Sequence, residues 1–152
     1  MDVPQLLNNA SGFVGTLGAK VENSGRDGAF LRLDAGPELH NHLGGPHAAA
    51  IFGLGETASF AVLLEVFGDL VETGVVPLIK SGTIAYSAVA LGPLLATSRL
   101  VDDEPSARAA LDARGSCSFD VEVVFRRESD DVQTATMTAT MALKRFPAKD
   151  AD

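Results

Sequence analysis

The pattern of hydrophobic and polar residues changes its period along the chain. Residues 47–72 are apolar on nearly every side of a helix, whereas residues 116–127 and 132–145 alternate between apolar and polar side chains. The clearest alternation is "VQTATMTATMALKR", in which threonines alternate with alanines and methionines. We therefore expect one long buried helix and several half-buried antiparallel strands.

Turn and breaker residues divide the rest of the chain. A short helix is expected at about 2–10, two strands within 13–36, and further strands at about 77–91 and 94–102. Because strands and helices do not alternate, we expect a single α+β domain over residues 1–152, with an antiparallel sheet of about five to six strands around one long central helix. Residues 102–114 read as an insertion with one or two helical turns, and 147–152 as a flexible tail.

Composition and charge narrow the possible partners. The net charge of −8 and the pI of about 4.7 argue against nucleic acid and against anionic membrane surfaces. Acidic residues interrupt the long helix, so no uncharged stretch is long enough to span a bilayer. The single cysteine, Cys117, permits no disulfide within the chain, and the N-terminus lacks a signal-like apolar run. A cytoplasmic protein is expected.

Four carboxylates interrupt the long helix, and one of them stands apart. Glu65, Asp69 and Glu72 share one helix face and are expected to form a solvated stripe. Glu56 lies nine residues before Glu65, about 180° away at roughly 100° per residue. Its neighbours on that side are Phe52, Ser59, Phe60 and Leu63. A carboxylate that faces packed apolar side chains lowers the stability of the fold unless a basic residue or a hydrogen bond anchors it. Without such a partner it is a candidate functional residue.

The loop before this helix contains all three histidines, His40, His42 and His47. A zinc site needs a better supported ligand shell than this spacing offers, so no metal is expected. The start of a helix presents free N–H groups and a positive dipole end, and the glycines of the loop allow close approach. A substrate carbonyl polarised there, with a carboxylate in reach, would suit acyl transfer.

The combined motif resembles a known family. Asn41, Gly44 and His47 are followed nine residues later by Glu56, and "VPLIKSGTIAYSAVALGPLLATSRL" follows the helix. This arrangement resembles the hot-dog-fold thioesterases, with the greatest similarity to the phenylacetate-pathway-like branch and a related uncharacterised branch. The resemblance extends from about residue 13 to residue 145 and implies a hot-dog fold.

The resemblance also implies roles for individual residues. Glu56 would be the general base or nucleophile, Asn41 would position water or the carboxylate, and His47 would orient the site. The N–H of Ala48 would polarise the thioester carbonyl. Substrate contacts would come from Gly44, Ser59 and Phe60, and from Ser81 or Thr83 of a partner chain. Such proteins pair side by side, so a homodimer or a dimer of dimers (a homotetramer) is expected.

The function implied is hydrolysis of an acyl-CoA, with no cofactor apart from the coenzyme A of the substrate. A carrier-protein thioester is less favoured because both partners would be acidic. The phosphates of coenzyme A would need basic residues, for which the candidates are Arg99, Arg108, Arg114, Arg126, Arg127, Lys144 and Arg145.

Two departures from the family pattern keep alternatives open. Alanines stand at positions 48 and 49 where the family has two glycines, and Val89 stands where a proline is usual after the third strand. One alternative is a hot-dog dehydratase acting on 3-hydroxyacyl thioesters, since His42 precedes Glu56 by fourteen residues, as such a site requires. The other is a protein that binds an acyl or hydrophobic ligand without turnover.

Overall fold

The computed structural model describes residues 1–146, and the expected tail at 147–152 lies outside the described residues. The elements in chain order are α1 (Val3–Asn8), α2 (Gly12–Leu17), β1 (Lys20–Gly25), β2 (Gly28–Leu33), a 3-10 turn η1 (Pro37–Leu39), α3 (Ala48–Glu72), β3 (Val76–Tyr86), β4 (Leu94–Leu100), α4 (Glu104–Arg114), β5 (Ser116–Arg127) and β6 (Gln133–Lys144).

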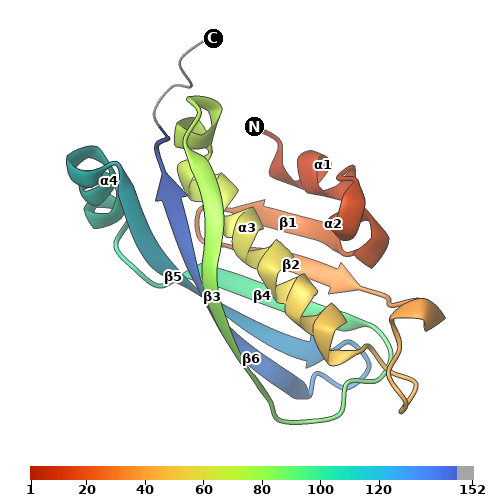
Figure 1. Ribbon diagram of the computed structural model, residues 1–152. Coiled ribbons are helices and arrows are strands. Elements are labelled where there is room, and N and C mark those ends of the chain that lie inside the picture. Colours follow the sequence, from red (N-terminus) through yellow and green to blue (C-terminus); the bar gives the residue numbers. More distant parts are fainter. Residues whose placement is uncertain (147–152) are drawn as a thin grey trace.

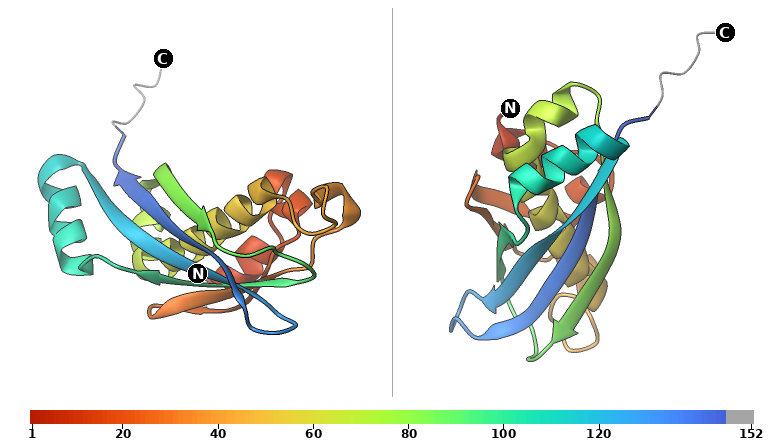
Figure 2. Two further views of the ribbon diagram at one scale, coloured as in Figure 1. Left: turned by 90° about the horizontal axis from the view of Figure 1, so that it is seen from below. Right: turned by 90° about the vertical axis from the view of Figure 1, so that its left-hand side faces the viewer.

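Six strands form one antiparallel sheet in the order β1-β2-β4-β5-β6-β3. The sheet curls around α3, which crosses its inner face (Figure 1, Figure 2). We call the side of the sheet toward α3 the inner face and the opposite side the outer face. The alternation in β6 fits this arrangement, because Met137 and Met141 are buried inward while Thr136 and Thr138 are exposed. The α+β hot-dog architecture expected from the sequence is confirmed.

The long helix begins and ends at recognisable signals. His47 precedes α3 in an extended conformation, and its side chain accepts a hydrogen bond from the N–H of Ala49. The helix ends at Glu72, and Gly74 follows with a left-handed φ of 93°. α3 is long and apolar enough to cross a membrane, yet 78% of its most apolar window is buried inside the fold. That burial is typical of the core helix of a folded domain.

Three glycines allow α3 to approach its neighbours closely. A Cβ on Gly55 would lie 2.5 Å from Met137 Sδ, and a Cβ on Gly53 would lie 2.8 Å from the ring of Phe13. From the sheet side, a Cβ on Gly82 in β3 would lie 2.7 Å from the ring of Phe52. In each case a side chain, rather than a backbone, occupies the space that the missing Cβ leaves.

The N-terminal region differs from the expectation of an immediate strand after Gly12. Residues 12–17 form the helix α2, and β1 begins only at Lys20. Phe13 and Leu17, four residues apart, both face Gly53 of α3, and Gly18 ends the helix with a left-handed φ of 71°. The contact with α3 therefore favours a helix in a segment with weak alternation.

The insertion after β4 is more regular than expected. Instead of one or two turns within a loop, residues 104–114 form α4. Asp103 precedes it and accepts a hydrogen bond from the N–H of Ser106, and Gly115 follows its last residue. Ala107 and Leu111 form its buried face. Arg108 joins α4 to the end of α3 through both carboxylate oxygens of Asp69.

The acidic stripe of α3 is therefore not simply solvated. Asp69 pairs with Arg108, and the Ser24 hydroxyl in β1 donates a hydrogen bond to Glu65. The hydrogen bonds from Arg108 hold the pKa of Asp69 below its usual value. The stripe thus fastens the C-terminal half of α3 to β1 and α4.

Candidate functional site

Glu56 lies near the middle of α3 and forms one wall of a cavity of about 440 Å³. The walls are Leu7, Phe13, Val14, Glu56, Thr57 and Phe60. Glu56 is half-buried rather than buried, and no basic side chain of residues 1–146 forms an ion pair with it. A carboxylate without a cationic partner at the edge of an apolar cavity is a candidate general base.

The two predicted neighbours of Glu56 lie in different surroundings. Phe60 lines the cavity one helical turn after Glu56. Ser59 is fully buried, and its hydroxyl donates to the carbonyl oxygen of Gly55 at 2.8 Å. Ser59 therefore lies outside this cavity, and its hydrogen bond is local to the helix.

The start of α3 supplies the second candidate group. Ala48 is the first residue of the helix and is exposed, so its N–H has no intrahelical acceptor. The Nδ1 of His47 accepts from the N–H of Ala49 at 3.0 Å, which requires that nitrogen to be unprotonated. The Tyr86 hydroxyl donates to the carbonyl oxygen of Ala48 at 2.9 Å, and partial burial raises the pKa of this hydroxyl. Tyr86 therefore fixes the helix start against β3.

Asn41 holds the loop before α3 in shape. Its side-chain oxygen accepts from the N–H of Leu43 at 2.8 Å, and its amide nitrogen donates to the carbonyl oxygen of Pro46 at 3.2 Å. Gly44 has a left-handed φ of 77°, a backbone conformation that favours glycine at this position. A Cβ on the next residue, Gly45, would collide with the carbonyl oxygen of Ala90. These contacts place the loop firmly beside the start of α3.

The two halves of the candidate site do not meet within one chain. Ala48 and Glu56 are eight residues apart, which is about 12 Å along a helix. That separation exceeds what one thioester carbonyl and its attacking water can bridge. A site that uses both groups therefore needs the second group from another chain.

The remaining predicted residues lie elsewhere. Ser81 and Thr83 flank Gly82, which faces Phe52, so their side chains point to the outer face of β3. Within one chain they lie on the opposite side of the sheet from Glu56. His42 is exposed in the loop and is absent from the walls of the Glu56 cavity. Among residues 1–146 no group of three His, Cys, Asp or Glu side chains is arranged to hold a metal ion.

Most of the basic residues considered for coenzyme A are already paired. Five of the seven form ion pairs: Arg99 with Glu122, Arg108 with Asp69 and Glu104, Arg126 with Asp131, Arg127 with Asp130, and Arg145 with Asp112. Arg114 and Lys144 have no acidic partner within the described part of the chain. Lys144 is aligned with Ser116 in β5, two residues after Arg114, and Lys80 Nζ donates to the hydroxyl of Ser118. Lys80 and Lys144 thus both lie beside residues 116–118 of β5, and Arg114 ends the helix that precedes this strand.

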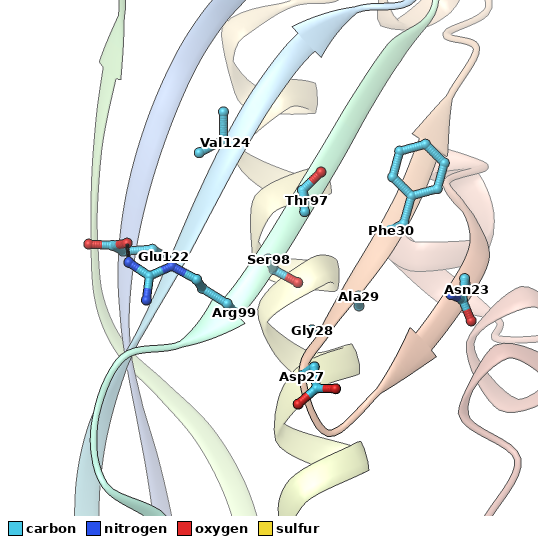
Figure 3. Close-up of a pocket in the computed structure, with 10 residues that line it drawn as sticks. All are labelled: Asn23, Asp27, Gly28, Ala29, Phe30, Thr97, Ser98, Arg99, Glu122 and Val124. Carbon is cyan, nitrogen blue, oxygen red and sulfur yellow. Dashed lines mark hydrogen bonds and ion pairs between the residues drawn. The ribbon is translucent and has the colours of Figure 1, made fainter.

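A second hollow, of about 370 Å³, lies on the outer face over β2, β4 and β5 (Figure 3). Phe30, Thr97 and Val124 line it, and Figure 3 shows α3 behind the strands that carry them. Its Glu122 is neutralised by Arg99. The hollow also contains Asp27, which forms no ion pair among the described residues, but the cavity between α1, α2 and α3 is the better candidate for chemistry because its Glu56 lies on the same helix as the exposed N–H of Ala48.

Sequence reasoning missed the walls that the N-terminal helices provide, Leu7, Phe13 and Val14. The apolar pair Phe13 and Leu17, at helical spacing between two glycines, could have indicated a helix packed on α3.

Comparison with known families identifies the chain. A model for a domain of unknown function, DUF4442, matches residues 3–143. The chain belongs to the DUF4442 family. No curated protein sequence matches this DUF4442 chain.

Solved structures similar to the DUF4442 chain include a Pseudomonas aeruginosa protein of unknown function described as a probable thioesterase. It shares 24% identity with a TM-score of 0.79, over 95% of this chain and 94% of that one. Thioesterase superfamily member 2 from mouse is 12% identical with a TM-score of 0.71, over 91% and 92% of the two chains. The zebrafish member 2 is 15% identical with a TM-score of 0.68, over 91% and 93%. At these identities the likeness establishes a shared hot-dog fold, as the resemblance in the sequence implied.

Proposed function

We propose that this protein hydrolyses acyl-CoA thioesters, with Glu56 as the general base. The observation that carries the proposal is the half-buried Glu56 carboxylate, without a cationic partner, at the wall of an apolar cavity. The descriptions of the structural neighbours as thioesterases support the same reaction class.

The reaction needs a base that takes a proton from water and a hydrogen-bond donor that stabilises the carbonyl oxygen as it becomes negative. Glu56 accepts a proton from water as the water oxygen forms its bond to the thioester carbon. The oxyanion that develops is stabilised by a hydrogen bond from the N–H of Ala48 at the positive end of α3. When the carbon–sulfur bond breaks, the proton on Glu56 passes to the departing thiolate, giving a carboxylic acid and free coenzyme A.

The two groups come from different chains in this proposal, because about 12 Å separates them along one helix. The edge of the sheet offers a surface for pairing, since within residues 1–146 β3 is hydrogen-bonded on one side only, to β6. Antiparallel pairing of two β3 strands would bring the Ala48 of one chain toward the Glu56 of the other. A homodimer is therefore the smallest active unit in the proposal.

Coenzyme A brings phosphate groups that an acidic protein would otherwise repel. Lys80 and Lys144, beside residues 116–118 of β5, form no ion pair with an acidic side chain of residues 1–146 and offer positive charge. The charge of these two lysines supports a coenzyme A thioester over a carrier-protein thioester.

The first test measures free thiol released from a panel of acyl-CoA substrates by the wild type and by Glu56→Gln. Loss of the base is expected to lower kcat by about 10²–10⁴-fold. Glu65→Gln is the matched control, because it removes a carboxylate from the opposite side of the same helix. Equal activity of Glu56→Gln and wild type would reject the assignment. Thermal stabilisation by acyl-CoA without any thiol release would instead favour a binding protein.

The second test removes one N–H and leaves the fold intact. Ala48 is the first residue of α3, where proline is tolerated, and the preceding His47 has the extended φ of −62° and ψ of 147° that proline requires. Ala48→Pro is expected to lower kcat by about 10²–10³-fold because the oxyanion loses its donor. Ala48→Gly keeps the N–H and is expected to retain activity. Full activity of Ala48→Pro would exclude this N–H from the reaction.

A further inference from the structure

Two separate cavities on the α1–α2 side of α3 share one wall, the ring of Phe13. The first, of about 440 Å³, contains Glu56 and lies between α1, α2 and α3. The second, of about 240 Å³, lies at the start of α3 and is lined by Phe13, Leu17, Glu38, Leu39, His40, His47, Ala49 and Ala50. Both cavities follow the same helix, and Phe13 stands between them.

Phe13 occupies this position without being buried. Its ring lies over Gly53, where a Cβ would be 2.8 Å from the ring edge, and Gly53 falls between Ala49 and Glu56 along α3. The side chain remains 61% exposed, an unusual state for a phenylalanine in contact with a core helix. The ring therefore gains little from burial in its present place.

The helix that carries Phe13 is suited to small movements. Gly12 and Gly18, at its two ends, have left-handed φ values of 67° and 71°, and no Cβ there would meet another atom. Ser11, which precedes the helix, makes no side-chain capping hydrogen bond. Leu17 is buried and anchors the end of α2, whereas the backbone torsions at Gly12 can change with little steric resistance, so any shift over α3 is largest at the Phe13 end of α2.

We propose that the two cavities are parts of one acyl-binding channel along α3, and that Phe13 sets the length of the acyl group the channel accepts. This inference rests on the proposed thioesterase function and adds the substrate class. A short acyl tail fills the cavity beside Glu56, and a longer tail must displace the Phe13 ring to enter the second cavity.

The walls also define the chemistry of the tail. The Glu56 cavity is lined mainly by apolar side chains, and its volume is within the usual range for small-molecule sites. The second cavity contains one carboxylate, Glu38, together with the imidazoles of His40 and His47. Uncharged hydrocarbon acyl groups are therefore the expected substrates, because the apolar walls and the Glu56 carboxylate of the first cavity disfavour a second carboxylate on the acyl group.

The test is a chain-length profile of kcat/KM for straight-chain substrates from butanoyl-CoA to hexadecanoyl-CoA. In the wild type, kcat/KM is expected to rise with length and then fall where the tail reaches Phe13. In Phe13→Ala, kcat/KM is expected to keep rising beyond the wild-type limit, by about fourfold for each further methylene that is buried. In Phe13→Trp, kcat/KM is expected to fall at a shorter chain length than in the wild type. Leu6→Ala, an exposed residue of α1 outside both cavities, is the control and keeps the wild-type profile. An unchanged profile in both Phe13 variants would overturn the channel.

A binding measurement separates failure of the channel from failure of the proposed function. S-alkyl-coenzyme A thioethers of the same lengths cannot be hydrolysed, and their binding is read as an increase in melting temperature. If the wild type releases no thiol from any substrate, but the preferred thioether length shifts in Phe13→Ala and Phe13→Trp, the channel stands and the proposed function fails. If no thioether raises the melting temperature of any of the three proteins, the channel is rejected.

Discussion

Gly55 offers a sharp test of how closely α3 packs on the sheet. A Cβ at this position would lie 2.5 Å from Met137 Sδ and 2.8 Å from Phe125 Cζ. Both side chains are buried, with exposed fractions of 2% for Met137 and 0% for Phe125, so neither can swing into solvent. Gly55→Ala must therefore displace core side chains or shift α3 itself.

The expected magnitude follows from two opposing terms. Replacing glycine by alanine inside a helix stabilises it by about 1 kcal/mol. Overpacking a well-packed core costs about 1–3 kcal/mol. Because two core side chains must move, we expect an overpacking cost of about 2–3 kcal/mol, in the upper part of that range, and so a net decrease of about 1–2 kcal/mol in the free energy of unfolding of Gly55→Ala.

Gly53 provides the matched comparison on the same helix. A Cβ there meets the ring edge of Phe13, which is 61% exposed and can move outward. The helix-forming gain of about 1 kcal/mol should then be largely retained, so Gly53→Ala is expected to be neutral or stabilising. Each variant adds one methyl group, and the two positions are two residues apart on the same helix. The difference between their free energies of unfolding is therefore more informative than either value alone.

Urea denaturation followed by circular dichroism measures both variants. For unchanged m-values, the midpoint should fall for Gly55→Ala and stay or rise for Gly53→Ala. A thermal melt should show a decrease of about 2–4 °C for each kcal/mol lost. If Gly55→Ala proves as stable as Gly53→Ala, the close packing of α3 on β5 and β6 described above is wrong.

Three further predictions concern the ends of α3 and the core. His47→Ala should destabilise the protein by about 1 kcal/mol in urea, because the N–H of Ala49 loses its acceptor, whereas His47→Asn should restore most of that loss. Arg108 lowers the pKa of Asp69, so the wild type should exceed Asp69→Asn in free energy of unfolding by a constant amount near neutral pH. This difference should disappear as the pH falls through the depressed pKa, below about 4. A difference that persists in acid would contradict the ion pair. Burial raises the pKa of the Cys117 thiol, so a thiol reagent should label it only after unfolding, and rapid labelling of the native protein would contradict its place in the core.

The parts of the fold that the sequence indicated are those in which local pattern and tertiary packing agree. The alternation in residues 132–145 and the apolar run from Ala48 both reflect burial against the same core, so period alone was sufficient. In α2 the pattern is weak, and its helical state depends on Phe13 and Leu17 meeting Gly53, a contact about forty residues away in the chain. Such a contact leaves little trace in local periodicity.

The same limit applies to the candidate site. The spacing of Glu56 from the acidic stripe identified an unusual carboxylate, because helix geometry is fixed. The face of β3 on which Ser81 and Thr83 lie was harder to assign, since a bulge between Ile79 and Ser81 shifts the alternation. The walls given by α1 and α2 depend on where those helices dock, which one sequence does not encode locally.

The position of β3 in the sheet has a consequence for the order of events during synthesis. β3 leaves the ribosome well before β6, which is its only strand partner among residues 1–146 and lies at the end of the described fold. Until residues 133–144 emerge, the nascent chain carries eleven residues of strand with no backbone partner on either side. Non-local pairing of this kind is slow, and exposed strand edges promote aggregation. Chains truncated before β6 should therefore be the species that chaperones retain, and closure of β3 on β6 should be among the last steps of folding.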